Sequence, residues 1–204
     1  MKNLKVTTTI LTMAFVGLMT VLSCKENKKE DQKESTEMTD MGHQDPMDMN
    51  ATASVEKLNY NIQGSDKTSG LVISYLQIKD ALVADNSEGA TEAGKMALQA
   101  FENFDASILN AEQQEKMKGL TGSAIEHVKT ISASGIKEQR EAFKQLSEDM
   151  TKIIAIAGTN AKLYEQFCPM YDRGSIWLSA EKDIKNPFYG SKMLNCGSVR
   201  KEIN

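Results

Sequence analysis

Four sulfur-bearing side chains lie in two pairs near the C-terminal end of the 204-residue chain. Cys168 stands two positions before Met170, and Met193 stands three positions before Cys196, with a proline or glycine beside each pair. Two short loops can therefore each present two sulfur atoms. Thiolate and thioether are soft donors, which favour Cu(I), and by the same softness Ag(I), over magnesium, calcium or manganese, and which also suit zinc. The spacing predicts a soft-metal site formed by these four residues.

The same residues have two other interpretations. Cys168 and Cys196 can form a disulfide, which would stabilise the fold by roughly 3 to 4 kcal/mol for a loop of this length. Met170 and Met193 can each fill a gap in an apolar surface, as methionine often does. The sequence alone leaves these alternatives open.

A second group of soft side chains precedes the folded part. It lies in a disordered tether, residues 24–60, whose stretch from Lys25 to about Ala53 has no large apolar side chain except methionine and so cannot bury enough surface to fold. Methionine has no packing use there, and imidazole also binds copper. The alternative is simple low complexity. We expect auxiliary metal capture by Met38, Met41, His43, Met47 and Met49.

His127 is the only histidine outside this tether. It lies near Ile125 and Val128 at helical spacing, where a partly buried or surface histidine is the ordinary interpretation and a fifth metal contact is the functional one. A nucleophilic cysteine would need His127 as its base, and no residue is identifiable that would orient the imidazole. Phosphate-binding glycine loops, His-Glu-x-x-His and Gly-x-Ser-x-Gly are all missing from the sequence. We therefore expect no catalytic activity.

The first 23 residues predict a signal peptide. Lys2 and Lys5 form a positive n-region, and an apolar run follows at residues 10–22 that is too short to span a bilayer. Ser23 before Cys24 resembles a lipobox, in which the cysteine is acylated and becomes the mature N-terminus. An ordinary secretory signal is the alternative. Lipidation of Cys24 predicts an exported protein, periplasmic or surface-facing, anchored to a membrane while its domain stays in water.

The charge balance argues against a nucleic-acid partner. The chain has 24 basic and 28 acidic side chains. Without residues 1–23, which hold two lysines and no acidic residue, 22 basic side chains face 28 acidic ones, a formal net charge of −6. A chain of this length suits one folded domain, which we place at residues 61–204.

Four stretches of this domain carry apolar residues at helical spacing. Short connections near residues 86–88, 107–110 and 133–135 favour antiparallel neighbours, which predicts an all-α fold, an up-down four-helix bundle. We interpret residues 138–141 as a solvated face with paired charges. The first helix is expected to start at Ser65-Asp66 and to end near Asp85-Asn86, and the second to run from after Ser87 to Ile108. The third is expected to start at Asn110, with Gln113 as its capping-box partner, and the fourth to run from Ile136 to a stop at Gly158.

The pattern changes after Tyr164. The remaining sequence contains two prolines and the only tryptophan of the chain, so no long helix fits it. An irregular segment this long inside a compact domain is usually functional or disordered, and its aromatic residues argue against disorder. We expect an irregular C-terminal cap, rich in cysteine, methionine and aromatic residues, that folds back over the bundle.

Several motifs between about residues 65 and 200 are shared with a known family. They include Tyr75-Leu76-Gln77-Ile78, Gln139-Arg140-x-x-Phe143, Phe167-Cys168-Pro169-Met170, Trp177-Leu178-Ser179, Asn186-Pro187-Phe188-Tyr189-Gly190 and Met193-Leu194-x-Cys196-Gly197. The chain resembles the DUF3347 family, an exported domain found alone or at the C-terminus of heavy-metal efflux membrane-fusion proteins. The resemblance implies a four-helix domain with a C-terminal cap that is associated with copper and silver handling. Cys-Pro-Met also resembles the opening of a metal-binding motif of copper exporters, whose other residues are missing here.

These observations predict an exported lipoprotein that binds Cu(I) or Ag(I) for sequestration or for hand-over to an efflux system, with a heavy-metal efflux adaptor as partner. The alternative is a disulfide-stapled, helical interaction module that is accessory to such an adaptor and binds no metal. In that case the aromatic residues Trp177, Phe188 and Tyr189 would form the docking surface.

Overall fold

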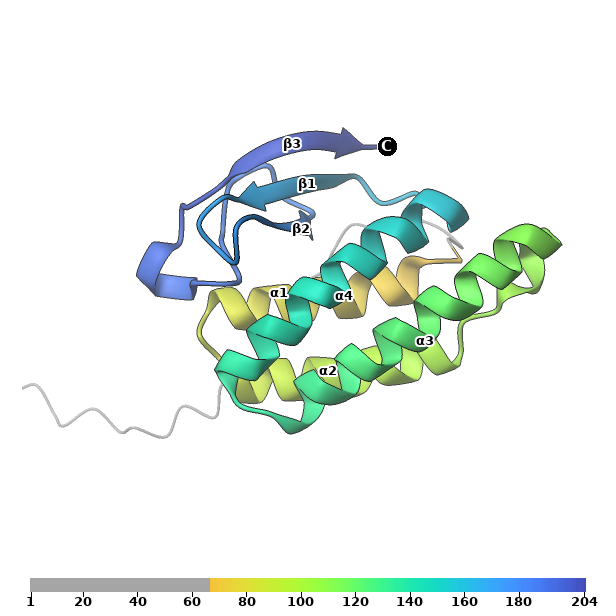
Figure 1. The fold of residues 1–204 in the computed structure, drawn as a ribbon, viewed down its shortest axis with the longest axis horizontal. Helices are drawn as coiled ribbons and strands as arrows, with labels where there is room; N and C mark the ends of the chain where they lie inside the picture. Colours follow the sequence, from red (N-terminus) through yellow and green to blue (C-terminus); the bar gives the residue numbers. More distant parts are fainter. Residues whose placement is uncertain (1–66) are drawn as a thin grey trace, which may run out of the picture. The chain divides into compact units, whose positions relative to one another are not determined.

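The computed structural model describes residues 67–204 (Figure 1). The predicted signal peptide and the whole predicted tether precede this range. Cys24 and the five predicted metal-capture residues of the tether therefore lie outside the described residues, and their assignments stay predictions. Within 67–204, no helix combines the length and the apolar character that crossing a membrane requires.

Four packed α-helices form the first part of the described chain, which confirms the predicted number of helices. Each helix packs against the next one along the sequence (Figure 1). A short 3-10 helix, η1, lies between the second and the third. The bounds are α1 Ser69–Val83, α2 Ser87–Glu102, η1 Ala106–Ile108, α3 Ala111–Ala133 and α4 Ile136–Ala157.

Local sequence signals set several of the helix ends. The capping box predicted at the start of α3 is confirmed, because the Asn110 side chain accepts the Gln113 N–H at 2.9 Å while the Gln113 side chain accepts the Asn110 N–H at 3.1 Å. Gly158 ends α4 at a φ of 76°, which favours glycine. By contrast, α1 begins at Ser69, with Thr68 as its N-cap residue. The predicted start at residues 65–66 was therefore too early.

The residues after α4 form a small antiparallel sheet, so the fold is mostly helical and the prediction of an all-α chain was wrong here. β1 (Leu163–Cys168) lies between β2 (Ser175–Ser179) and β3 (Ser198–Ile203). β2 packs against α4 and α1, and the sheet lies over these two helices (Figure 1). A second 3-10 helix, η2 (Gly190–Met193), lies in the long connection between β2 and β3.

The sheet escaped prediction because its strands lack a clean two-residue alternation. β1 buries two polar residues in succession, Glu165 and Gln166, and a pairing irregularity falls between them. The side chains of β3 are mostly exposed. Between β1 and β2 the chain reverses direction through Asp172, Arg173 and Gly174, which all have positive φ. Because neither β1 nor β3 has a regular alternation, periodicity alone does not predict these strands.

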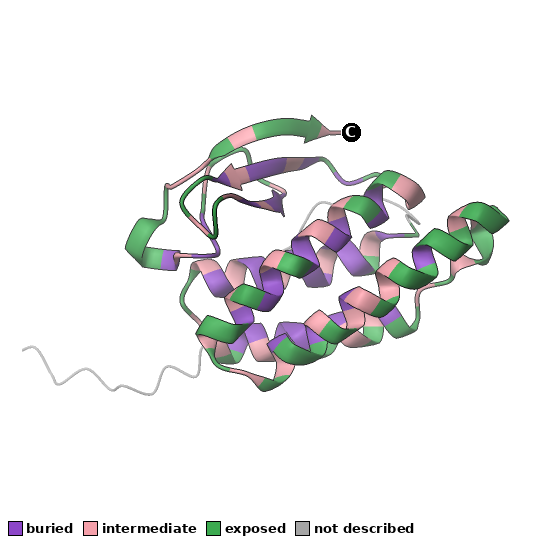
Figure 2. Ribbon diagram, in the orientation of Figure 1, coloured by how far each residue is buried: buried purple, intermediate pink, exposed green. Residues whose placement is uncertain are grey.

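Helices and sheet share one hydrophobic core. Figure 2 shows buried residues on the inward faces of the helices and on β1 and β2. Among the largest fully buried side chains, Tyr75 and Phe143 come from helices, and Trp177 and Phe188 come from the C-terminal segment. The C-terminal segment is therefore a packed part of the domain, and its loops have a fixed base.

Candidate functional site

The structure brings the two cysteines of residues 67–204 together. Cys168 ends β1, Cys196 lies two residues before β3, and their Sγ atoms are 3.3 Å apart as free thiols. Cys168 is fully buried, whereas Cys196 is partly exposed. The hydrogen bond between the two thiols and, after it, burial raise the pKa of the Cys196 thiol. The pair is a compact two-sulfur unit that solvent reaches from the Cys196 side.

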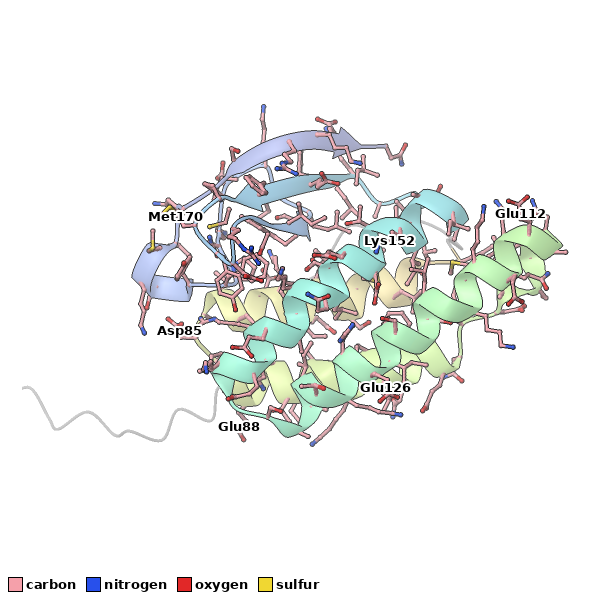
Figure 3. All side chains as sticks on the ribbon, viewed as in Figure 1. Asp85, Glu88, Glu112, Glu126, Lys152 and Met170 are labelled. Carbon is pink, nitrogen blue, oxygen red and sulfur yellow. The ribbon has the colours of Figure 1, made fainter. Side chains whose placement is uncertain are left out.

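The two methionines of the predicted site are exposed side chains on neighbouring loops. Met170 lies between β1 and β2 and is 62 % exposed, and Met193, the last residue of η2, is 39 % exposed. In Figure 3, Met170 lies at the end of the sheet next to η2. An exposed thioether fills no gap in a core. The sulfur atoms of both loops thus remain available to a ligand from solvent.

One buried residue, Asn186, closes the loop that carries Cys196. Its N–H donates to the Leu194 carbonyl at 2.8 Å, and its side-chain Nδ2 donates to the Cys196 carbonyl at 2.7 Å. Its Oδ1 accepts the N–H groups of Phe188 and Tyr189 at 2.8 and 3.2 Å. Because Asn186 is fully buried, these bonds do not compete with water, and they give the loop one defined shape.

The Cys196 loop, which we define as residues 186–196, is fastened to the helices by two charged residues. Arg140 on α4 donates from Nε to the Pro187 carbonyl at 2.9 Å and from Nη2 to Asp85 Oδ1 at 2.5 Å. Asp85, labelled in Figure 3, accepts the Ser191 N–H through Oδ2 at 3.0 Å. The hydrogen bonds from Ser191 and from the Arg140 guanidinium hold the pKa of the Asp85 carboxyl well below its usual range.

Gly190 is required where this loop passes the ion pair. Its φ is 57°, a conformation that L side chains rarely adopt, and a Cβ placed there would collide with Asp85 Oδ1 and Arg140 Nη2. The main chain can therefore approach the helices only without a side chain at this position.

The Met170 loop, residues 169–174, is held against the Cys196 loop by aromatic side chains. The Tyr171 ring stacks on Phe188 with centroids 4.6 Å apart and meets Tyr189 edge-on at 5.6 Å. The Tyr189 hydroxyl donates to the Met170 carbonyl at 2.9 Å. These contacts fix the main chain beside Met170 relative to the loop that carries Met193 and Cys196.

His127, the predicted fifth contributor, lies elsewhere. Its Nε2 atom is 3.3 Å from Ser123 Oγ on the same helix and 3.6 Å from Asp149 Oδ2 on α4. Within the described residues α3 contacts α2, α4 and η1 but none of the strands. The structure therefore brings the two cysteines together and does not bring His127 to them, either as a metal ligand or as a base.

Sequence reasoning missed the residues that organise the loops. The interpretation of residues 138–141 as a solvated face was wrong for two of them: Gln139 is fully buried and donates to the Ile131 carbonyl at 3.0 Å, and Arg140 anchors the Cys196 loop. The dipeptide Asn186-Pro187 carried a turn signal that could have indicated the closing role of Asn186. No local signal pairs Arg140 with Asp85, because 55 residues separate them.

Carboxylates and imidazoles do not assemble an alternative metal centre in the described part of the chain. No group of three or more His, Cys, Asp or Glu side chains there is arranged to hold an ion. A metal bound at the cysteine pair with more than two protein ligands would therefore draw on other donors, of which the two exposed thioethers are the nearest soft ones along the sequence.

Comparison with known proteins identifies the helical part. Residues 71–162 match the family described as protein of unknown function (DUF3347), which confirms the predicted family. The match ends before β1, so the motifs between Phe167 and Gly197 lie outside it. No curated protein and no solved structure matches the chain. The chain therefore carries a DUF3347 domain at residues 71–162.

Proposed function

We propose that this protein is an exported lipoprotein that binds Cu(I) or Ag(I) through Cys168 and Cys196, with Met170 and Met193 as further ligands. The observation that carries the proposal is the 3.3 Å distance between the two thiol sulfurs, one buried and one partly exposed. Two free thiols, with an exposed thioether on each of the two loops that adjoin them in the sequence, offer a donor set that suits soft ions. Such a site can sequester the ion or pass it to an efflux adaptor, and it performs no reaction.

The sulfur separation favours an ion over a covalent bridge. Two thiolates on one tetrahedral ion, with bonds of about 2.3 Å as for zinc, lie about 3.8 Å apart. The thiols would have to separate by only about 0.5 Å from their present distance, whereas a disulfide of about 2.05 Å requires an approach of about 1.2 Å. Because Cys168 is fixed at the end of a strand, the smaller movement is easier to accommodate.

His127 is not part of the proposed site. His127 lies on α3, which does not contact the sheet, and its imidazole is near Asp149 of α4. Acylation at Cys24 would hold the domain at a membrane, and the methionines and histidine of residues 38–49 would collect ions weakly. Zinc also suits two thiolates, but thioether ligands favour a softer ion.

The test is a titration of the full mature chain, reduced, with Cu(I) against a competing chelator of known affinity. The double variant Cys168→Ser, Cys196→Ser should no longer bind the Cu(I) ion that the parent binds most tightly, and should keep only weak binding. The double variant Met170→Leu, Met193→Leu should bind at least about tenfold more weakly, since each lost ligand bond removes a kcal/mol or more. Met96→Leu is the control, because Met96 on α2 is as exposed as Met193, and this variant should bind like the parent.

An unchanged affinity in the cysteine double variant would remove the proposed site. An unchanged affinity in the methionine double variant alone would leave a two-thiolate site, for which zinc is as good an ion as Cu(I). Repeating the titration with Zn²⁺ separates these two results.

The alternative, a disulfide-stapled interaction module, also requires the two cysteines to lie close together. Its predicted docking surface fits less well, because Trp177 and Phe188 are buried in the core and only Tyr189 is partly exposed. Mass measurement of protein isolated under non-reducing conditions, with and without thiol alkylation, distinguishes the two. If the disulfide is complete, alkylation leaves the mass unchanged, and neither cysteine is available as a thiolate to bind metal.

A further inference from the structure

Tyr189 joins the two loops that carry the sulfur atoms. Its main-chain N–H donates to Asn186 Oδ1 at 3.2 Å, which makes it part of the closed Cys196 loop. Its hydroxyl donates to the carbonyl of Met170, 19 residues earlier, at 2.9 Å. Among the described residues, this is the one hydrogen bond that runs between a side chain of the Cys196 loop and the main chain of Met170.

We infer that Tyr189 is a positioning residue, which fixes the main chain of Met170 so that its thioether can reach an ion held by Cys168 and Cys196. The inference rests on the proposed function. It adds a residue that donates no ligand atom and yet sets the affinity of the site.

Such a restraint matters for Met170 because its own side chain is exposed, while the other contacts of its loop are made by Tyr171 and Asp172. The Met170 side chain is 62 % exposed, and its loop passes through two non-glycine residues at positive φ, Asp172 and Arg173. Binding an ion through an exposed, unbranched side chain costs rotamer freedom, and a mobile main chain would add to that cost. A hydroxyl that holds the neighbouring carbonyl removes part of the cost before the ion arrives.

Tyr189 is itself well placed to act as a fixed point. Its N–H is held by buried Asn186, its ring meets Tyr171 edge-on, and the next residue, Gly190, passes close to the Asp85–Arg140 ion pair. The position of the Tyr189 hydroxyl is therefore set by the Cys196 loop. The hydrogen bond from this hydroxyl to Met170 fixes the Met170 loop relative to the Cys196 loop.

The test is Tyr189→Phe in the full mature chain, which removes the hydroxyl and keeps the ring. We expect Cu(I) affinity to fall about threefold to fivefold, the range for one partly exposed hydrogen bond. Tyr164→Phe on β1 is the matched control, since Tyr164 is also half-buried and its ring lies beside Lys162, away from both loops. Its affinity should equal that of the parent.

A double-mutant cycle separates positioning from general destabilisation. If Tyr189 acts through Met170, adding Tyr189→Phe to Met170→Leu should change the affinity no further, whereas adding it to Met193→Leu should reduce the affinity by the full factor. Additive losses in both backgrounds, or parent affinity in Tyr189→Phe while the cysteine double variant has lost its tight site, would overturn this inference alone. Tight binding that survives removal of both cysteines would overturn the proposed function and this inference with it.

Discussion

The four helices and the C-terminal segment after residue 162 are ordered by different kinds of interaction. The helices bury repeated apolar positions, such as Leu76, Leu146 and Ile153, and their order is spread over many similar contacts. The loops of the C-terminal segment depend on a few polar residues, of which Asn186 and Arg140 each hold several groups at once. A single substitution should therefore disturb the loops more selectively than the helices.

The two parts nevertheless meet in a shared aromatic cluster. Phe143 on α4 stacks on Tyr75 of α1 at 5.0 Å and lies 6.0 Å from Phe188 of the Cys196 loop, which in turn meets Trp177 of β2 edge-on at 5.8 Å. The Leu178 N–H also donates to the buried Tyr75 hydroxyl at 3.0 Å. The difference between the parts thus concerns how each is ordered, while their stability is coupled.

The largest effect should come from removing the side chain that joins sheet and loops. Trp177→Ala leaves a cavity in a fully buried site and should lower the free energy of unfolding by about 3 to 5 kcal/mol. Urea denaturation followed by far-ultraviolet circular dichroism measures this loss. Because the core is shared, the helices should unfold in the same transition as the sheet.

Trp177→Phe is the control for this coupling. The indole N–H of Trp177 is buried without a hydrogen-bond partner, so phenylalanine loses ring area but also removes an unsatisfied donor, and the loss should be well below that of alanine. Two separate transitions in Trp177→Ala, with the helices as stable as in the parent, would show that the parts are not coupled.

A smaller effect, confined to the loops, should follow from Asp85→Asn. Neutralisation weakens the bonds to Ser191 and Arg140 and should cost about 1 kcal/mol, since Asp85 is exposed and solvent screens its charge. The pKa of this carboxyl is lowered in the folded state, so its contribution is complete above the unfolded pKa of about 3.9 and is lost as pH falls through the lower folded value. The difference between parent and variant should be constant from pH 7 to pH 5 and should shrink below pH 4.

The rate at which Cys196 is alkylated reports on the same loop and should rise in Asp85→Asn. Asp105→Asn is the control, because Asp105 also has a lowered pKa but caps η1, in the connection between α2 and α3. An equal rise in both variants would mean that the ion pair with Arg140 does not govern the Cys196 loop.

The same contrast explains what could be predicted from the sequence. The helices and the capping box at Asn110 follow from local periodicity and side-chain bonds, which act within a few residues. Both predictions for Cys168 and Cys196, a shared ion and a disulfide, required the two side chains to meet, and they do. The pairing of β1 with β3, which brings them together, was not predicted. The closing role of Asn186 has a partial local trace in the turn signal of Asn186-Pro187, whereas the role of Arg140 depends on contacts across the fold, with Asp85 and Pro187, and has none.

The smallest effect should come from the capping box of α3, which belongs to the helical part alone. Asn110→Ala removes the acceptor for the Gln113 N–H and should lower the free energy of unfolding by about 0.5 to 1 kcal/mol, as for other exposed N-caps. Hydrogen exchange should quicken in the first turn of α3, while the alkylation rate of Cys196 stays at the parent value, because α3 does not contact the strands. Asn110→Asp keeps an acceptor and should restore the slow exchange. Faster alkylation of Cys196 in Asn110→Ala would show that disorder at the start of α3 reaches the Cys196 loop. The loop would then not be ordered independently of the helix cap.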